Sequence, residues 1–225
     1  MLLPPALFEP ISAHFAHHTV WHAARLRGQD ELRKTLPGEC NAALAGIHEV
    51  GSGCDFLRFH RRMIQHFLLL LENVKPSAFR WRPWDGPRLP SWVEEALLAD
   101  RPSFDLEEAY GRIRAFINAG DVENLGGFIE SNELWRGERG ASLHNRVHVA
   151  IDRYECAMYC GDETSPMRDL GQSPGNVFFW LLHDWIDRRY AECQEAVKDE
   201  VDRSPRVMHV DIHRVPSGVT LKMLD

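Results

Sequence analysis

Residues 143–148 have the sequence LHNRVH, which sets His144 and His148 one helical turn apart. Residues four positions apart lie on the same face of a helix, so both imidazoles can bind a single ion. Residues 178–187, FFWLLHDWID, carry His183 within an aromatic and largely apolar helical segment. A set of imidazoles with no thiolate or carboxylate suits copper, zinc or iron. The two stretches together predict a metal site held by helices.

The composition is that of one globular domain. The chain has 225 residues, 44% of them apolar, which suffices for a single core and a single domain spanning residues 1–225. A net charge of −7 argues against a nucleic-acid partner, because no basic face can offset that balance. No apolar run approaches the length of a membrane span, and no basic region followed by an apolar segment opens the sequence. We therefore expect a soluble, cytoplasmic protein without a membrane partner.

The five cysteines agree with that expectation. Their number is odd, so they cannot all pair within one chain, and none forms a Cys-x-x-Cys pair. Cys156 and Cys160 lie four positions apart in an expected helix, where we expect buried, reduced thiols. Reduced thiols favour a cytosolic setting.

Apolar residues at helical spacing indicate a helical protein. The expected helices cover residues 11–27, 41–48, 56–74, 105–118, 143–159 and 176–197. Residues 75–92, rich in proline and tryptophan, predict a long ordered loop, and residues 207–221 predict a short strand. There is no internal repeat and no domain linker. The pattern predicts a mainly α-helical bundle with long irregular loops and with histidines facing inward from several helices.

A further stretch, DFLRFHRRM at residues 55–63, adds His60. With it, the chain resembles the type-3 copper family, which includes tyrosinases, catechol oxidases and o-aminophenol oxidases, and it is most similar to a shortened bacterial tyrosinase. The resemblance implies a four-helix bundle in which paired helices hold two copper ions, each bound by three histidines. His144, His148 and His183 match the ligands of the second copper. Further matching blocks are ELWRG at 133–137, PWD at 83–85 and the segment 220–225.

The first copper site matches the family only in part. His48, at the end of an expected helix, matches its first ligand, and His60 matches its third. The family's long loop with the second ligand is reduced here to residues 49–54, which contain no histidine. The alternatives are His22 swinging in from the N-terminal helix, a thiolate from Cys54, a contribution from His66, or a site that lacks one ligand.

Other histidines and neighbours differ from the family or carry no assigned role. Leu182 precedes His183 where the family often has a second histidine, and Leu68 stands where it usually has a glutamate. We interpret the N-terminal histidines as a solvated helix face, with adventitious metal binding as the next option. They are His14, His17, His18 and His22.

The resemblance also implies catalytic roles for Glu133 and Asn145. In the resembling enzymes, an upstream glutamate and an asparagine after the first ligand hold a water that takes the phenol proton. Such a base would separate monooxygenase activity on phenols from oxidation of catechols. Asp187 is a candidate acceptor that orients a metal-bound ring.

The leading functional hypothesis is a copper-dependent oxidase that acts with O2 on a phenolic, catecholic or o-aminophenolic small molecule. Two copper ions are expected, of which the sequence supports one complete set of ligands. The alternative is a mononuclear copper or zinc protein that keeps only the triad of the second copper, with altered or lost oxidase activity. A third class is a helical interaction module that retains the histidines without turnover.

Overall fold

The computed structural model describes residues 1–25, 44–47, 49–76, 79–131, 134–135, 138–160 and 166–196. Within these ranges the chain is mainly helical, as the sequence predicts. The α-helices are α1 (Pro5–Ala24), α4 (Ser52–Val74), α5 (Ser91–Asp100), α6 (Leu106–Ala119), α7 (Val122–Glu130), α8 (Leu143–Glu155) and α9 (Val177–Ala196). Two short strands, β1 (Leu134–Trp135) and β2 (Glu138–Arg139), pair antiparallel. Three single turns complete the described elements: η1 (Cys156–Cys160), η2 (Pro166–Arg168) and η3 (Ser173–Gly175).

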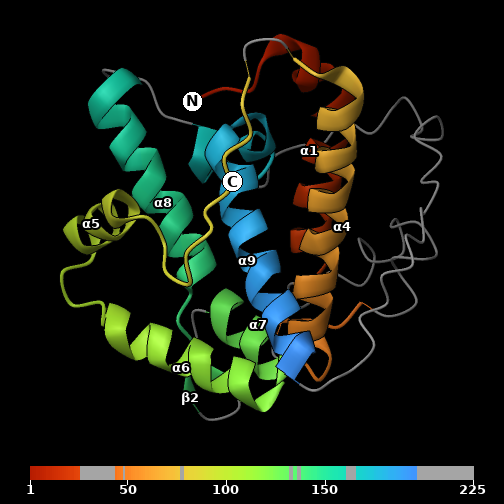
Figure 1. Cartoon of the computed structure of the whole chain (residues 1–225). Helices are drawn as coiled ribbons and strands as arrows, with labels where there is room; N and C mark the ends of the chain where they lie inside the picture. Colours follow the sequence, from red (N-terminus) through yellow and green to blue (C-terminus); the bar gives the residue numbers. More distant parts are fainter. Residues whose placement is uncertain are drawn as a thin grey trace.

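Helix α9 is the centre of the molecule (Figure 1). It lies between α4 and α8 and also packs on α6 and α7. Helix α1 runs along α4, and α5 covers α8. The four helices α1, α4, α8 and α9 therefore surround one interior. In the described part of the chain, no helix is both long and apolar enough to cross a lipid bilayer.

The core forms where the apolar faces of α4 and α9 meet. Helix α4 buries Phe56, Ile64 and Phe67 on one face, in agreement with its amphipathic sequence. Trp180 of α9 is fully buried and stacks on Phe67, with ring centroids 4.3 Å apart. Burial of aromatic pairs of this kind contributes both apolar area and ring–ring attraction, so it fixes the two helices against each other.

Two expected elements are wrong in detail. Residues 44–47 form no helix, although the expected helix covered residues 41–48. Their amides bond to carboxylates instead of helix carbonyls: Ala45 donates to Asp55 at 2.8 Å and Gly46 to Glu49 at 2.6 Å. The expected helix 143–159 ends as α8 at Glu155, and a π-helical turn follows. The expected strand at 207–221 lies outside the described residues.

Helices α5 and α7 were not expected from the sequence. Pro90 precedes α5, and its proline-rich surroundings resemble a loop more than a helix start. Helix α7 begins after Asp121, whose side chain accepts a 3.1 Å hydrogen bond from the Asn124 amide. The sequence Gly126–Gly127 is typical of a turn. In the structure both residues are helical, and they allow α7 to pack closely on α4.

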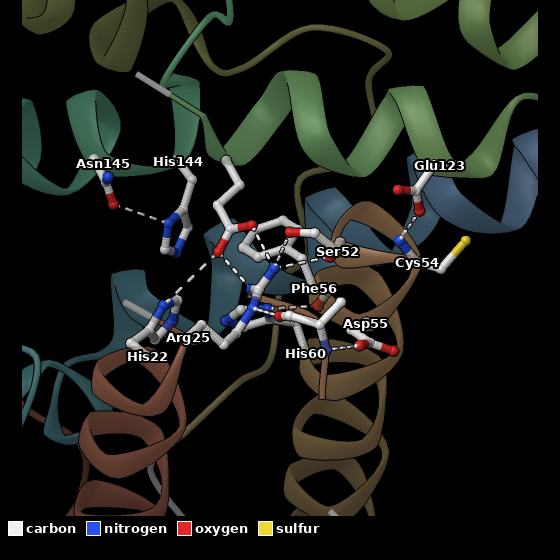
Figure 2. A network of polar contacts seen from close by, with 12 residues as sticks. His22, Arg25, Ser52, Cys54, Asp55, Phe56, His60, Glu123, His144 and Asn145 are labelled. Atoms are coloured by element: carbon white, nitrogen blue, oxygen red, sulfur yellow. Dashed lines mark hydrogen bonds and ion pairs between the residues drawn. The ribbon is translucent and has the colours of Figure 1, made fainter. Parts of the chain in front are cut away.

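The glycines of α7 permit a backbone-to-backbone crossing with α4. A Cβ at Gly126 would overlap the Gly53 carbonyl oxygen, and a Cβ at Gly53 would overlap the Glu123 carbonyl oxygen. The Glu123 carboxylate also accepts hydrogen bonds from the amides of Gly51 at 2.8 Å and Cys54 at 2.9 Å. Helix α7 therefore caps the N-terminus of α4 and fixes its position (Figure 2).

We expect Gly126→Ala to destabilise the protein by about 2–4 kcal/mol, because the added methyl group forces the α4–α7 crossing apart. Urea denaturation followed by circular dichroism would measure the loss. Gly111→Ala in α6 is the matched control, since nothing lies within 4 Å of the new Cβ. That control should be neutral or stabilising by up to about 1 kcal/mol. Equal effects of the two substitutions would contradict the close crossing.

Candidate metal centre

Six histidine rings meet in the interior between α1, α4, α8 and α9. Five are buried, and the His22 side chain is only 12% exposed. Each ring contacts at least two others, with centroids 4.5–6.0 Å apart. The members are His18 and His22 of α1, His60 of α4, His144 and His148 of α8, and His183 of α9. We call this set the histidine cluster.

Most rings of the cluster are anchored by Nδ1. Four donate from Nδ1 to a backbone carbonyl, and His144 donates to a side-chain amide oxygen, because carbonyl oxygens can only accept. The pairs are His18 to Leu170 at 3.0 Å, His60 to Phe56 at 2.8 Å, His148 to Met167 at 2.9 Å, His183 to Phe179 at 2.7 Å, and His144 to Asn145 at 3.1 Å. With the proton on Nδ1, each of these rings keeps its lone pair on Nε2.

The Nε2 atoms of the cluster lie in the buried interior. The Nε2 atoms of His18, His22, His60 and His148 are buried and have no hydrogen-bond partner among the described residues. Nε2 of His144 lies 3.0 Å from Nε2 of His183, so two acceptor atoms face each other. Nitrogens that share one ion at about 2.0–2.1 Å stand roughly 3.3 Å apart. The arrangement suits a cation and leaves buried acceptors unsatisfied without one.

The trio on α8 and α9 has the geometry expected from the sequence. Potential ligand atoms of His144, His148 and His183 lie within 4.8 Å of one another. The i, i+4 pair lies on one face of α8, and α9 brings His183 across from it. Two further trios meet the same distance: His18, His60 and His183, and His22, His60 and His144. The described residues that can hold a metal are thus all histidines.

Burial keeps the cluster neutral. It lowers the pKa of His18 to about 3 and that of His148 to about 4. The pKa values of His22, His60, His144 and His183 are also lowered well below 6.5, first by burial and then by neighbouring histidines. Neutral imidazole is the form that binds a metal ion, so the site is in its binding state at neutral pH.

The remaining residues considered for the site lie in different places. His48 and Glu133 are outside the described residues. Asn145 is exposed at the start of α8 and accepts the His144 proton (Figure 2). His66 is half-buried on α4 and belongs to none of the trios. Cys54 is also absent from them, and burial raises the pKa of its thiol to about 11, which disfavours the thiolate.

Two interpretations of the sequence need correction. His18 and His22 are not a solvated face, because α1 turns both rings toward α4, where they contact Phe59 and His60. Their i, i+4 spacing is the same signal that identified His144 and His148. Asp187 orients no histidine, since its carboxylate accepts a 2.5 Å hydrogen bond from Arg61.

A buried ion pair beside the cluster was not expected from the sequence. Arg25, 1% exposed at the end of α1, donates to both carboxylate oxygens of Glu130 at 2.6 and 2.9 Å. It also donates to the carbonyl and hydroxyl oxygens of Ser52 at 2.8 and 2.5 Å. Nδ1 of His22 is 4.0 Å from the Glu130 carboxylate. Arg25 thus joins the ends of α1 and α7 to the start of α4.

Comparison with known proteins finds a similarity over part of the chain. Residues 90–196 match the family model described as the common central domain of tyrosinase. Two curated tyrosinases align over 68 residues, which is 30% of this chain and 19% of each relative: that of Streptomyces glaucescens is 37% identical and that of Streptomyces antibioticus is 38% identical. No solved structure matches. Over residues 90–196, which include His144, His148 and His183, the chain is thus similar to the central domain of tyrosinases.

We expect the metal-free protein to lose stability as the pH falls from 6.5 toward 4. Unfolded histidines titrate near their ordinary pKa of about 6.5, whereas the lowered pKa values keep the folded rings neutral. The unfolded state therefore takes up more protons, and the free energy of unfolding falls by up to about 1.4 kcal/mol per pH unit for each such ring.

The carboxyl group of Glu130 has the opposite effect on how stability changes with pH. Burial raises the pKa of Glu130 to about 7, so its protonation below that pH favours the folded state. Six rings outweigh this single group, and the net stability declines. Urea denaturation of the chelator-treated protein between pH 7 and 5 measures how the free energy of unfolding changes with pH. His148→Gln should reduce this slope by the contribution of one ring, which is up to about 1.4 kcal/mol per pH unit. A free energy of unfolding that does not change with pH would contradict the conclusion that these rings are buried and neutral.

Proposed function

We propose that this chain is a copper-dependent oxidase that acts with O2 on a phenolic, catecholic or o-aminophenolic small molecule. The 3.0 Å approach of the two Nε2 atoms of His144 and His183, with His148 beside them, supports this proposal most directly. We take these three residues as the ligands of the second copper and His60 as a ligand of the first. The proposal treats the chain as one copper domain with two ions, located in the cytoplasm.

The residues around the cluster hold the histidine rings in place and bury them. Bound copper would supply the electron-transfer chemistry with O2. Phe179 packs on the His183 ring with centroids 4.1 Å apart, and Phe56 lies 5.2 Å from the His144 ring. These rings exclude water from the inner side of the trio. Asn145 is exposed next to the buried His144, so this side of the trio lies nearest to solvent.

The proton of a phenolic substrate needs an acceptor before the oxygen can bind a metal. We assign this role to a water held by Asn145 and Glu133, following the resemblance to bacterial tyrosinases. Asn145 also fixes the His144 ring through its amide oxygen, so its side chain would serve both tasks. The monooxygenase activity on phenols depends on this pair.

The second candidate function is a mononuclear copper or zinc protein built on His144, His148 and His183 alone. One observation favours it: both other trios share a histidine with this one. Metal analysis separates the candidates, because the oxidase requires two coppers per chain. A coupled cupric pair is also silent in electron paramagnetic resonance, whereas a single cupric ion gives a signal.

We expect His183→Ala to lose at least one equivalent of copper and all oxidase activity, because it removes one of three ligands from the trio. Atomic absorption on the purified, copper-reconstituted protein and oxygen uptake with a catechol are the two measurements. His66→Ala is the control, as it removes a half-buried histidine from α4 that belongs to no trio. Full copper content in His183→Ala would refute the site.

We expect Asn145→Ala to slow monophenol hydroxylation at least about tenfold more than catechol oxidation, because we assign the water held by Asn145 to the deprotonation that precedes hydroxylation. Initial rates with the two substrates give the ratio. Asn145→Asp is the matched variant, since its carboxylate still accepts the His144 proton and keeps the ring oriented. Equal losses on both substrates in Asn145→Ala would leave Asn145 with the orienting role alone.

A further inference from the structure

We propose that the ion pair of Asp152 and Arg168 positions the His148 ring. It does so by fixing the turn of residues 166–170 against α8, and we call this segment the anchor turn. The inference rests on the proposed function, because it takes His148 as a ligand of the second copper. It goes beyond that function by assigning a role to two residues that belong to none of the histidine trios.

The anchor turn holds two rings of the histidine cluster through its backbone. His148 donates from Nδ1 to the Met167 carbonyl oxygen at 2.9 Å. His18 donates from Nδ1 to the Leu170 carbonyl oxygen at 3.0 Å. The first ring comes from α8 and the second from α1, so one short segment sets the direction of rings on two helices.

His148 differs in this respect from two other rings of the cluster. His60 donates to Phe56 and His183 donates to Phe179, and in both cases the acceptor lies one turn earlier in the same helix. Each of those two helices therefore orients its own ring. The acceptor of His148 lies in a different segment, so the direction of this ring depends on where the anchor turn sits relative to α8.

An ion pair fixes that relative position. The guanidinium of Arg168 lies 3.3 Å from Oδ2 of Asp152. Asp152 follows His148 by one turn on the same face of α8, and Arg168 follows Met167 directly. The Asp152 side chain is only 3% exposed, and its Oδ1 has no hydrogen-bond partner among the described residues. A buried carboxylate needs a nearby cation, and Arg168 supplies it.

Other contacts keep the anchor turn folded. The Met167 side chain is buried in the core. Oδ1 of Asp169 accepts hydrogen bonds from the amides of Gly171 at 2.7 Å and Gln172 at 3.2 Å. These contacts do not involve Arg168. Replacing Arg168 would therefore loosen the turn against α8 without unfolding it.

The test uses Arg168→Gln, Asp152→Asn and the corresponding double variant of the full chain. Arg153→Gln is the matched control, because Arg153 is also a largely exposed arginine that pairs with a buried aspartate, Asp100. That pair joins α8 to α5 instead of to the anchor turn. Circular dichroism verifies folding of each variant. Because Arg168 is 53% exposed, Arg168→Gln decides the test if Asp152→Asn does not fold.

Two quantities are measured. The first is the copper affinity of the reconstituted protein, by competition with a chelator. The second is the tautomer of the His148 ring in the metal-free protein at neutral pH, by nuclear magnetic resonance of its ring nitrogens. The His148 signal is identified by its absence in His148→Gln. A residue that only stabilises the fold would not change this tautomer.

We expect the unsubstituted protein and Arg153→Gln to carry the His148 proton on Nδ1, as the hydrogen bond to Met167 requires. In Arg168→Gln and Asp152→Asn, the fraction of this tautomer should fall and copper affinity should drop about tenfold. The double variant should lose no more affinity than the weaker binder of the two single variants, because the two residues act as one pair.

An unchanged tautomer or an unchanged copper affinity in folded Arg168→Gln would overturn the inference while the oxidase proposal stands. Additive losses in the double variant, or an equal loss in Arg153→Gln, would overturn it as well. If the unsubstituted protein binds no copper, the proposed function fails. The tautomer of the metal-free protein then decides by itself whether the pair positions the ring.

Discussion

The structure depends on buried imidazoles whose Nδ1 protons are already committed to backbone carbonyls. His60 and His183 each donate to the carbonyl one turn earlier in their own helix, so the helix itself sets the direction of the ring. The consequence is a concentration of buried acceptor nitrogens that have no hydrogen-bond partner among the described residues. Each buried acceptor without a partner costs on the order of 1–3 kcal/mol. Binding of a cation removes that cost, which makes metal affinity and folding stability two aspects of the same interaction.

The second constraint is the contact of α7 with α4. Glycine at positions 53 and 126 lets the two backbones touch, and Glu123 caps the start of α4. Glu130, at the other end of α7, receives the Arg25 guanidinium. A short helix therefore fixes both the helix that carries His60 and the helix that carries His22. Neither end of α7 contributes a ring to the histidine cluster, yet each positions a helix that does.

The sequence predicted the half of the centre that rests on local spacing. His144 and His148 are one turn apart in the sequence, and helical geometry alone places them together. The prediction that His183 joins them was based on the aromatic, largely apolar segment around it, residues 178–187. The long periodic segments of α4, α6, α8 and α9 were also predicted, within a few residues at each end. The prediction of a mainly α-helical fold is confirmed.

Features that depend on long-range packing could not be predicted in this way. The i, i+4 spacing of His18 and His22 is equally compatible with an exposed face, and only the docking of Trp21 on Phe59 buries it. Gly126 indicates a turn unless the facing Gly53 is known. Arg25 and Glu130 are ordinary charged residues by sequence, and their pairing joins segments that are 105 residues apart. Tertiary contact overrides local propensity at each of these positions.

The order of the helices has a consequence for biogenesis. Helix α1 leaves the ribosome first and α9 last, while the cluster requires rings from both. At translation rates of about 5–20 residues per second, the histidines of α1 wait on the order of ten seconds for their counterparts. The complete centre therefore cannot assemble on the nascent chain before α9 is made. Synthesis must proceed at least through His183 of α9 before all six rings of the cluster can meet.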